Sequence, residues 1–201
     1  MPLSALMENV TVYRWWQAPF AEKKLEPLLR RPDLARARRV LDVGCGPGTN
    51  TRHFAAADYV GVDMNPDYIE YARRRFGRPF VVADVRSFEP PSGEKFDFIL
   101  VNSLLHHIDD DGTHQILRSL AGLLTPDGHV HILDLILPDR PTLARAVARW
   151  DRGDYPRPAE AWERIFRSYF EPVVTEPYPL GAWGLTLWNM LYFKGRRRVE
   201  A

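Results

Sequence analysis

The residues best suited to chemistry lie in the stretch VLDVGCGPGTN, which occupies positions 40–50. A short apolar run, typical of a buried strand, stops at three glycines, which are Gly44, Gly46 and Gly48. Glycine adopts backbone angles that other residues avoid, and it has no Cβ, so a ligand can lie directly against the main chain. The stretch therefore predicts a strand, a sharp turn and a short helix over about residues 49–57, with the turn binding a ligand.

Two classes of nucleotide cofactor use a loop of this kind. The dinucleotide fingerprint spaces its glycines as G-x-G-x-x-G and rests a pyrophosphate on the helix that follows. This chain has G-x-G-x-G instead, with Thr49 where the third dinucleotide glycine would stand, and Asp42 precedes Gly44 by two residues. A carboxylate at that point repels a pyrophosphate and suits a cationic amine or sulfonium. The loop thus favours a nucleoside-type cofactor, with a nicotinamide dinucleotide as the alternative.

Four further apolar runs follow the loop, and each of them ends in a polar side chain. The runs are YVGVD, FVVAD, FDFILVN and HVHILD, and they end at Asp63, Asp84, Asn102 and Asp134. Near-continuous apolar strands separated by helical stretches are typical of a parallel sheet that is covered on both faces. Ligands bind such sheets beyond the carboxyl ends of the strands. The alternative is that each of these residues only caps a helix or forms a turn. That explanation suits one or two positions, but it is a poorer explanation for all five once Asp42 is counted with them.

These runs resemble the class I S-adenosylmethionine-dependent methyltransferases of the small-molecule type. The resemblance covers roughly residues 38–135 and is carried, in order, by VLDVGCGPGT, GVDMNPDYIEYAR, VVADVRSF, FDFILVNSLLHHI and LLTPDGHVHIL. It implies an α/β fold: a Rossmann-like, seven-stranded, mostly parallel sheet with an antiparallel last strand and helices on both faces. It also implies S-adenosyl-L-methionine as cofactor, S-adenosyl-L-homocysteine as product, and a small-molecule substrate.

The resemblance assigns cofactor contacts to individual positions. A carboxylate at Asp63 can accept both ribose hydroxyls, and Met64 can lie against the adenine face or simply pack in the core. Asp84 and the backbone N–H of Val85 would recognise the adenine edge. The other candidates are in the loop, in the fourth strand and in the N-terminal helix: Asp42, Gly44, Cys45, Gly46, Gly48, Thr49, Asn102 and Tyr13. For Tyr13, packing is the alternative to a contact with the methionyl carboxylate.

The segment 102–112 carries the catalytic candidates. It lacks the prolines and the aromatic residue of nucleobase amino-methyltransferases, and the cysteine of cytosine C5-methyltransferases. His106 and His107 occupy the position where the resembled family places an acid–base residue, and histidine titrates near neutrality. At least one of them can equally be a hydrogen-bonded core residue, and we expect His106 to face the cleft. Asp134 can assist this base, bind substrate or merely end a strand.

Metal binding is the other possible use of this segment, because Asp109 to Asp111 and His114 lie close by in the sequence. The acids directly precede a predicted helix over residues 113–124, where carboxylates complement the helix dipole. The set has no recognised metal spacing. We therefore expect no metal site.

The composition sets limits on partners and location. The chain has 201 residues and a formal net charge of +1, so no bulk attraction to nucleic acid or membrane is expected. Its one cysteine, Cys45, excludes a disulfide framework, and no apolar stretch is long enough to span a bilayer. We expect a cytoplasmic protein, either monomer or homodimer. Short arginine runs leave methylation of RNA or protein as an alternative, and a non-catalytic protein that kept the fold is another.

We expect one domain over residues 1–201, made of three parts. Residues 1–37 form a helical cap broken at Pro19 and Pro27, residues 38–135 form the cofactor-binding core, and residues 136–201 supply the substrate pocket and a closing strand pair. In the last part, helices over 142–150 and 158–170 flank a loop in which Arg152, Tyr155 and Arg157 hold an anionic or aromatic substrate or form a solvated hinge. The closing strands are expected over 171–180 and 185–194, with Trp183 and Trp188 lining the pocket or packing.

Overall fold

The polar strand ends belong to one seven-stranded sheet, in the order β3-β2-β1-β4-β5-β7-β6. The computed structural model describes residues 10–90, 93–142, 144–145, 154–182 and 185–198, and it describes side chains from residue 20 onwards, apart from that of Ala182. The strands are β1 (Arg39–Val43), β2 (Asp58–Asp63), β3 (Phe80–Val82), β4 (Phe96–Asn102), β5 (Leu124–Ile136), β6 (Phe170–Ala182) and β7 (Leu185–Arg197). Six strands share one direction and β7 runs antiparallel to both of its neighbours, as predicted.

The strand order reverses between β1 and β4. From β1 the chain proceeds outward through β2 to β3, then returns to β4 on the other side of β1 and continues to β5. In open α/β sheets, ligands bind at this reversal point, outside the carboxyl ends of the strands. The loops that follow β1 and β4 therefore face the same crevice, and these loops contain the glycines and the catalytic candidates.

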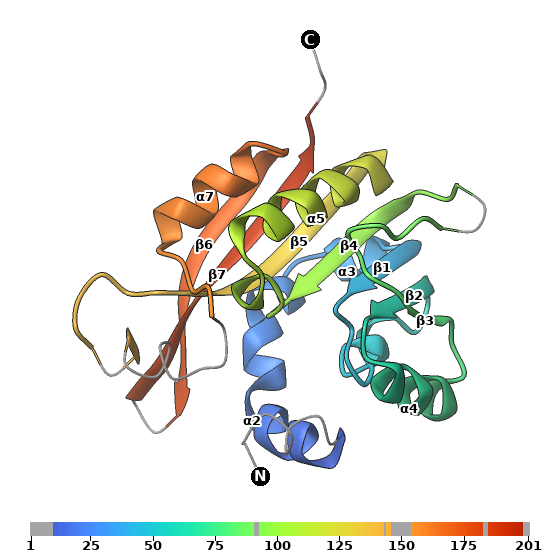
Figure 1. The fold of residues 1–201 in the computed structure, drawn as a ribbon, viewed down its shortest axis with the longest axis horizontal. Coiled ribbons are helices and arrows are strands. Elements are labelled where there is room, and N and C mark those ends of the chain that lie inside the picture. The colour runs from blue at the N-terminus through green and yellow to red at the C-terminus, as the bar shows by residue number, and fades with distance from the viewer. Residues whose placement is uncertain (1–9, 91–92, 143, 146–153, 183–184, 199–201) are drawn as a thin grey trace.

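Helices cover both faces of the sheet (Figure 1). α5 (Asp110–Leu123) and α7 (Ala159–Arg167) lie on one face, while α2 (Val10–Leu29), α4 (Pro66–Phe76) and the 3₁₀ turn η1 (Thr51–Phe54) lie on the other. A four-residue helix, α3 (Asp33–Arg36), follows α2, and a second 3₁₀ turn, η2 (Leu105–His107), follows β4. None of the described helices is both long and apolar enough to cross a membrane.

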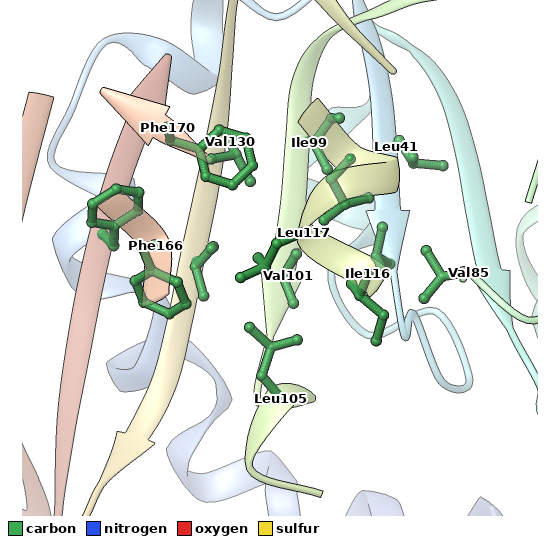
Figure 2. Close-up of a cluster of buried hydrophobic side chains, with 14 of the residues drawn as sticks. Leu41, Val85, Ile99, Val101, Leu105, Ile116, Leu117, Val130, Phe166 and Phe170 are labelled. Atoms are coloured by element: carbon green, nitrogen blue, oxygen red, sulfur yellow. The ribbon is translucent and has the colours of Figure 1, made fainter. Parts of the chain in front are cut away.

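Alternating side chains along the strands build one core on each face. Figure 2 shows strand residues such as Ile99 and Val101 of β4 packed against Ile116 and Leu117 of α5. The neighbouring residue Leu100 points to the opposite face, into the cluster beneath α2 and α4. Full burial of each such side chain stabilises the fold by about 1.5–3 kcal/mol. Because both faces are covered, the register of the strands, and with it the position of their carboxyl ends, is fixed.

Local signals define α4 as predicted. The Asn65 side chain accepts hydrogen bonds from the backbone N–H groups of Asp67 and Tyr68, and Pro66 takes the first helical position. Gly77 ends the helix with φ at 62°, a left-handed conformation that glycine adopts without strain. This helix leads the chain from the end of β2 back to the start of β3.

The N-terminal helix differs from the prediction. We expected Pro19 and Pro27 to interrupt it, but α2 is assigned as one helix of 20 residues that contains both prolines. Figure 1 shows it bent along its length, which is what a proline inside a helix produces. The helix is held against the sheet through Leu25 and Leu28, which are almost fully buried. Burial of these side chains outweighs the lost backbone hydrogen bonds.

Two further elements are shorter or longer than expected. The helix predicted over residues 49–57 is only the single turn η1, and the Arg78 guanidinium donates to the carbonyl oxygens of Phe54 (2.7 Å) and Ala57, which a longer helix would have paired internally. Residues 126–128 lie inside β5, which begins before the run HVHILD, and its pairing with β4 is irregular. A Cβ on Gly128 would come within 2.8 Å of the Phe96 carbonyl oxygen, so glycine allows this close passage.

The closing strand pair is confirmed and is longer than predicted. β6 and β7 have 13 residues each, and β7 pairs with β5 on its other side. Trp183 lies outside the described residues, as do Arg152 and most of the helix predicted over 142–150. The helix predicted over 158–170 is α7, which begins after Pro158.

Candidate functional site

The glycine loop has the left-handed backbone that its sequence predicts. Gly44, Gly46 and Gly48 have φ values of 66°, 53° and 81°, a region that residues with a Cβ rarely adopt. The backbone N–H groups of Gly44 and Cys45 both donate to the carbonyl oxygen of Val62, at 2.8 and 3.1 Å. These bonds tie the loop to the end of β2. The loop is thus fixed at the reversal point of the sheet, where residues 45–48 are buried.

Asp63 contacts this loop directly. This is expected if the polar residues at the carboxyl ends of the strands lie together along one edge of the sheet, which we call the rim. One carboxylate oxygen accepts from the backbone N–H of Gly46 at 2.8 Å, and the other accepts from the backbone N–H of Asn65 at 2.9 Å. The next residue, Met64, is 63% exposed and is not part of the core, which removes packing as the explanation for it. A carboxylate and an exposed thioether therefore stand side by side at the edge of the glycine loop.

Asp42 is placed differently from the prediction, because it lies beneath the rim rather than projecting from it. Its side chain is fully buried (0% exposed) and accepts from the Tyr59 hydroxyl at 2.8 Å and from the Asn50 amide at 3.2 Å. Burial raises the pKa of Asp42 to about 7, and the nearby charge of Asp63 acts in the same direction, against the two hydrogen bonds. Asp42 is the next-to-last residue of β1, and its hydrogen bond with Asn50 connects it to the polar side chains at the rim.

A chain of polar side chains continues from Asn50 across the crevice. The Asn102 amide donates to the Asn50 side-chain oxygen at 3.4 Å, and the Ser103 hydroxyl donates to the Asn102 oxygen at 3.3 Å. Lys24 of α2 completes the chain by donating to the Ser103 hydroxyl at 3.2 Å. Ser103 has φ at 56°, a strained value for a residue with a side chain, and such strain is common at functional sites. The loops after β1 and β4 are therefore physically joined, with α2 above them.

Sequence reasoning missed most of this polar chain. Asn50 was considered only as a helix start, and Ser103 and Lys24 carry no sequence pattern that marks them. Asn102, in contrast, was predicted from its position at the end of a strand. The positive φ of Ser103 depends on tertiary contacts, since its backbone N–H donates to the Leu133 carbonyl oxygen of β5 at 2.8 Å. That long-range bond has no local signal.

His106 and Asp134 form a buried pair across the ends of β4 and β5. The Nδ1 atom of His106 lies 2.5 Å from one carboxylate oxygen of Asp134, and His106 is only 4% exposed. The same carboxylate accepts from the backbone N–H groups of Leu105 and Leu135, each at 2.7 Å. Burial acts to raise the pKa of Asp134, but His106 and the two backbone donors outweigh it and hold that pKa below its usual value. An ionised Asp134 accepts only, so the neutral imidazole carries its proton on Nδ1 and leaves Nε2 as an acceptor.

The two adjacent histidines are therefore not equivalent. His106 is buried against Asp134, while His107 is exposed, with its ring centroid 4.1 Å from that of His106. His106 is the hydrogen-bonded buried residue that the sequence allowed for one of the two, and the prediction that it faces the cleft stays a prediction. Asp134 is bonded to a histidine, and whether it assists a base, binds substrate or only ends a strand stays a prediction.

The remaining predicted contacts are spread around the rim. Asp84 is paired with Arg86, whose Nε lies 3.0 and 2.8 Å from the two carboxylate oxygens and whose hydrogen bonds lower the pKa of Asp84. Val85 is buried and Thr49 is half-buried. The Cys45 thiol is buried, which raises its pKa far above the usual value, and cofactor contacts by Thr49 and Cys45 stay predictions. Adenine recognition by Asp84 and Val85 stays a prediction. The Tyr13 side chain lies outside the described residues.

The described part of the segment before α7 is not simply a solvated hinge, because Arg157 is buried. Arg152 lies outside the described residues, and substrate binding by Tyr155 stays a prediction. The described part of the segment forms one wall of a groove of about 730 Å³, opposite the first turn of α5. Within the described part of the chain, no group of three or more histidine, cysteine or acidic side chains is arranged to hold a metal ion.

The groups at the rim fit a nucleoside. Asp63 can accept hydroxyl groups, and Met64 beside the glycine loop offers an exposed apolar surface. The His106–Asp134 pair adds a group that can accept a proton beside this nucleoside site.

Comparison with known proteins gives the same answer. Residues 40–128 match the family model described as a methyltransferase domain. A trans-aconitate 2-methyltransferase of Escherichia coli is 34% identical over 193 residues, which are 91% of this chain and 73% of that protein. One from Methylobacterium radiotolerans is 37% identical over 142 residues, 64% of this chain, and the chain spans about half of that relative (52%).

A solved structure shows the same fold at lower identity. N-methyltransferase NodS of Bradyrhizobium japonicum, in complex with S-adenosyl-L-homocysteine, superposes with a TM-score of 0.72 at 21% identity, over 90% of this chain and 89% of that chain. Together, the fold, the glycine loop and the relatives identify the cofactor as S-adenosylmethionine and exclude the dinucleotide alternative. The chain belongs to the class I S-adenosylmethionine-dependent methyltransferases.

Proposed function

We propose that this chain transfers the methyl group of S-adenosylmethionine to a small-molecule acceptor by in-line displacement, and that His106 is the residue that meets the acceptor. The observation that carries the proposal is the 2.5 Å contact between His106 and Asp134 at the carboxyl ends of β4 and β5. When bound, S-adenosylmethionine supplies an electrophilic methyl carbon and a neutral thioether leaving group. The protein has mainly to hold the two reactants in position.

Positioning falls to the residues around the glycine loop. The three glycines allow the main chain to approach the cofactor, and Asp63 accepts the ribose hydroxyls while Met64 lies against the base. Charge-assisted hydrogen bonds of this kind are roughly twice as strong as neutral ones. Holding two reactants at near-attack distance can supply up to about 7–11 kcal/mol of the barrier in ideal cases. Most of the rate enhancement is therefore expected from orientation rather than from acid–base chemistry.

His106 serves different acceptors in different ways. For a hydroxyl or protonated amine acceptor, the neutral imidazole takes the proton on Nε2, while Asp134 holds Nδ1–H and stabilises the imidazolium that forms. For a carboxylate acceptor, the nucleophile is already ionised, so no base is needed and a protonated His106 donates a hydrogen bond to it instead. His107 is the second candidate for this role, since it is exposed beside His106.

Small carboxylic acids are the first acceptor class to consider. The relatives are named for trans-aconitate, a small tricarboxylate. In this chain the Lys24 ammonium donates to Ser103 at the same rim, on the acceptor side of the crevice. A positive group at this point favours an anionic acceptor. The electrostatics and the relatives thus support the same class.

The test is an acceptor screen with methyl-labelled S-adenosylmethionine. Trans-aconitate and other small di- and tricarboxylates are compared with hydroxyl and amine acceptors, with RNA and with protein extract. We expect label in a small acid. Transfer of label only to RNA or to protein would reject the small-molecule assignment.

Histidine variants then separate the roles. With a hydroxyl acceptor, His106→Asn should lower kcat by about 10²–10⁴-fold, the usual contribution of a general base. With a carboxylate acceptor, the same variant should act mainly on KM. His129→Asn, a half-buried histidine of β5 away from the rim, is the matched control and should leave both constants unchanged. Loss of activity in His107→Asn but not in His106→Asn would reassign the role to His107.

A further inference from the structure

The Arg157 guanidinium is buried and all of its donors are occupied. Arg157 is 8% exposed. Its Nε donates to Asp110 at 2.8 Å, its Nη1 donates to the carbonyl oxygens of Tyr155 (3.1 Å) and Leu105 (3.4 Å), and its Nη2 donates to the Ile108 carbonyl oxygen at 3.0 Å. Nη2 also lies 2.6 Å from Asp110. Since arginine has five N–H donors, none is left for a substrate anion.

The targets of these bonds surround His106. Leu105 and Ile108 lie on either side of the histidine pair, and their carbonyl oxygens both accept from Arg157. The His106 carbonyl oxygen itself accepts from the backbone N–H of Tyr155 at 3.0 Å. The segment 155–157 thus binds three of the four carbonyl oxygens of residues 105–108.

The turn that carries His106 has little stability of its own. η2 has only three residues, and its internal backbone bonds are from His107 to Leu104 and from Ile108 to Leu105, at 3.1 and 3.0 Å. Asp134 holds the turn from one side, through Leu105 and the imidazole. Arg157 holds it from the other side, and Arg157 is in turn fixed by the Trp162 ring, whose centroid is 4.5 Å from the guanidinium carbon.

The ion pair with Asp110 is the least important of the Arg157 contacts. The Asp110 side chain is 75% exposed, and exposed ion pairs contribute little because water screens them. The bonds to the carbonyl oxygens are shielded, and their geometry requires the planar fork of a guanidinium. A single ammonium group in its place can satisfy only part of the set.

We propose that Arg157 is a positioning residue for methyl transfer: it holds the 105–108 turn so that the His106 imidazole keeps its bond to Asp134 and presents Nε2 to the acceptor. This inference rests on the proposed role of His106. It gives residues 155–157 a defined function, namely to support the catalytic turn from outside.

The test compares Arg157→Gln and Arg157→Lys with Asp110→Asn, which removes the ion pair and leaves the carbonyl bonds. We expect Arg157→Gln to lower kcat by about 10–100-fold while the KM for S-adenosylmethionine stays within about two-fold, since a 1 Å misplacement can cost about 10² in rate. Arg157→Lys should recover part of this loss, and Asp110→Asn should stay within about two-fold of the wild type in both constants. The double variant Arg157→Gln/His106→Asn should be no slower than His106→Asn alone.

A spectroscopic readout separates this proposal from the one it rests on. In ¹⁵N-labelled protein the Nδ1–H proton bonded to Asp134 should give a resolved downfield signal in the wild type and in Asp110→Asn. The same signal should broaden or vanish in Arg157→Gln. If the glutamine variant does not fold, Arg157→Lys is used in its place and should show the same change. If His106→Asn is fully active but the signal behaves as expected, the catalytic role of His106 is wrong and the positioning by Arg157 stands. An unchanged signal and an unchanged kcat in folded Arg157 variants would overturn the positioning role, as would a loss confined to the KM of the acceptor.

Discussion

Two buried groups on one face of the sheet should give opposite pH dependences of stability. Asp42 has its pKa raised to about 7 by burial, from an ordinary value of 3.8. Between these two values the folded protein keeps a proton that the unfolded chain has lost. The stabilising contribution of Asp42 is therefore fully present below about pH 4, and it is lost as the pH rises through the folded pKa. The loss amounts to about 1.4 kcal/mol per pH unit, or about 4 kcal/mol in total.

His131 of β5 acts in the other direction. Burial lowers its pKa to about 3 from 6.5, and Lys194 adds to this effect. The neutral ring has its Nδ1 atom 2.9 Å from the Tyr192 hydroxyl, and its centroid lies 4.0 Å from that of the Phe98 ring. Between these pKa values the unfolded chain binds a proton that the folded protein does not, so stability falls as the pH drops, by up to about 5 kcal/mol. Over about pH 4–6.5 the two contributions oppose each other.

The perturbation is to remove one group at a time. Between about pH 4.5 and 6.5, the free energy of unfolding of Asp42→Asn should gain a positive slope of about 1 kcal/mol per pH unit relative to the wild type. That of His131→Gln should gain a negative slope of similar size, because each variant removes one of two opposing contributions. Urea unfolding at fixed pH, followed by tryptophan fluorescence, measures all three curves.

The difference between each variant and the wild type isolates one group from the other titrating side chains. A pair of variants whose curves run parallel to that of the wild type would refute the reasoning, because neither group would then titrate with a displaced pKa. If the slopes of unfolding free energy against pH shift in opposite directions in the two variants, Asp42 is partly neutral beneath the rim at neutral pH.

Two further variants test the rim itself. Asp63→Asn should weaken binding of S-adenosylmethionine by about 10–100-fold in calorimetry, since it replaces charge-assisted hydrogen bonds by neutral ones, while Asp67→Asn on the exposed side of α4 should leave the affinity unchanged. Gly48→Ala should reduce both stability and cofactor affinity, because its Cβ would come within 2.8 Å of the Phe76 ring at a φ of 81°. Gly77→Ala is the matched control: its φ is also positive but its Cβ meets open space, so thermal unfolding should show a loss of about 1 kcal/mol with no change in affinity.

Much of the fold could be predicted because its signals are local. Apolar runs that end in Asp63 or Asn102 mark the strands, and Asn65-Pro66 with Gly77 marks α4 at both ends. The glycine loop could be predicted because its three positive φ values leave a direct trace in residue type. These features each depend on a few neighbouring residues.

The features that escaped prediction depend on partners far along the chain. Asp42 was expected at the rim because its own sequence position does not show that Tyr59 and Asn50 bury it. The burial of Arg157 depends on carbonyl oxygens about fifty residues earlier, at Leu105 and Ile108. A solvated arginine and a buried one look the same in a sequence, because burial depends on carbonyl oxygens that distant parts of the chain supply.

A crystal structure with S-adenosyl-L-homocysteine bound tests the central claim most directly. The account predicts the ribose hydroxyls on the Asp63 carboxylate, the main chain of Gly44 to Gly48 against the nucleoside, and His106 still bonded to Asp134 on the side open to the acceptor. The product bound elsewhere, for example in the groove beside Arg157, with Asp63 making no contact to it, would contradict the account.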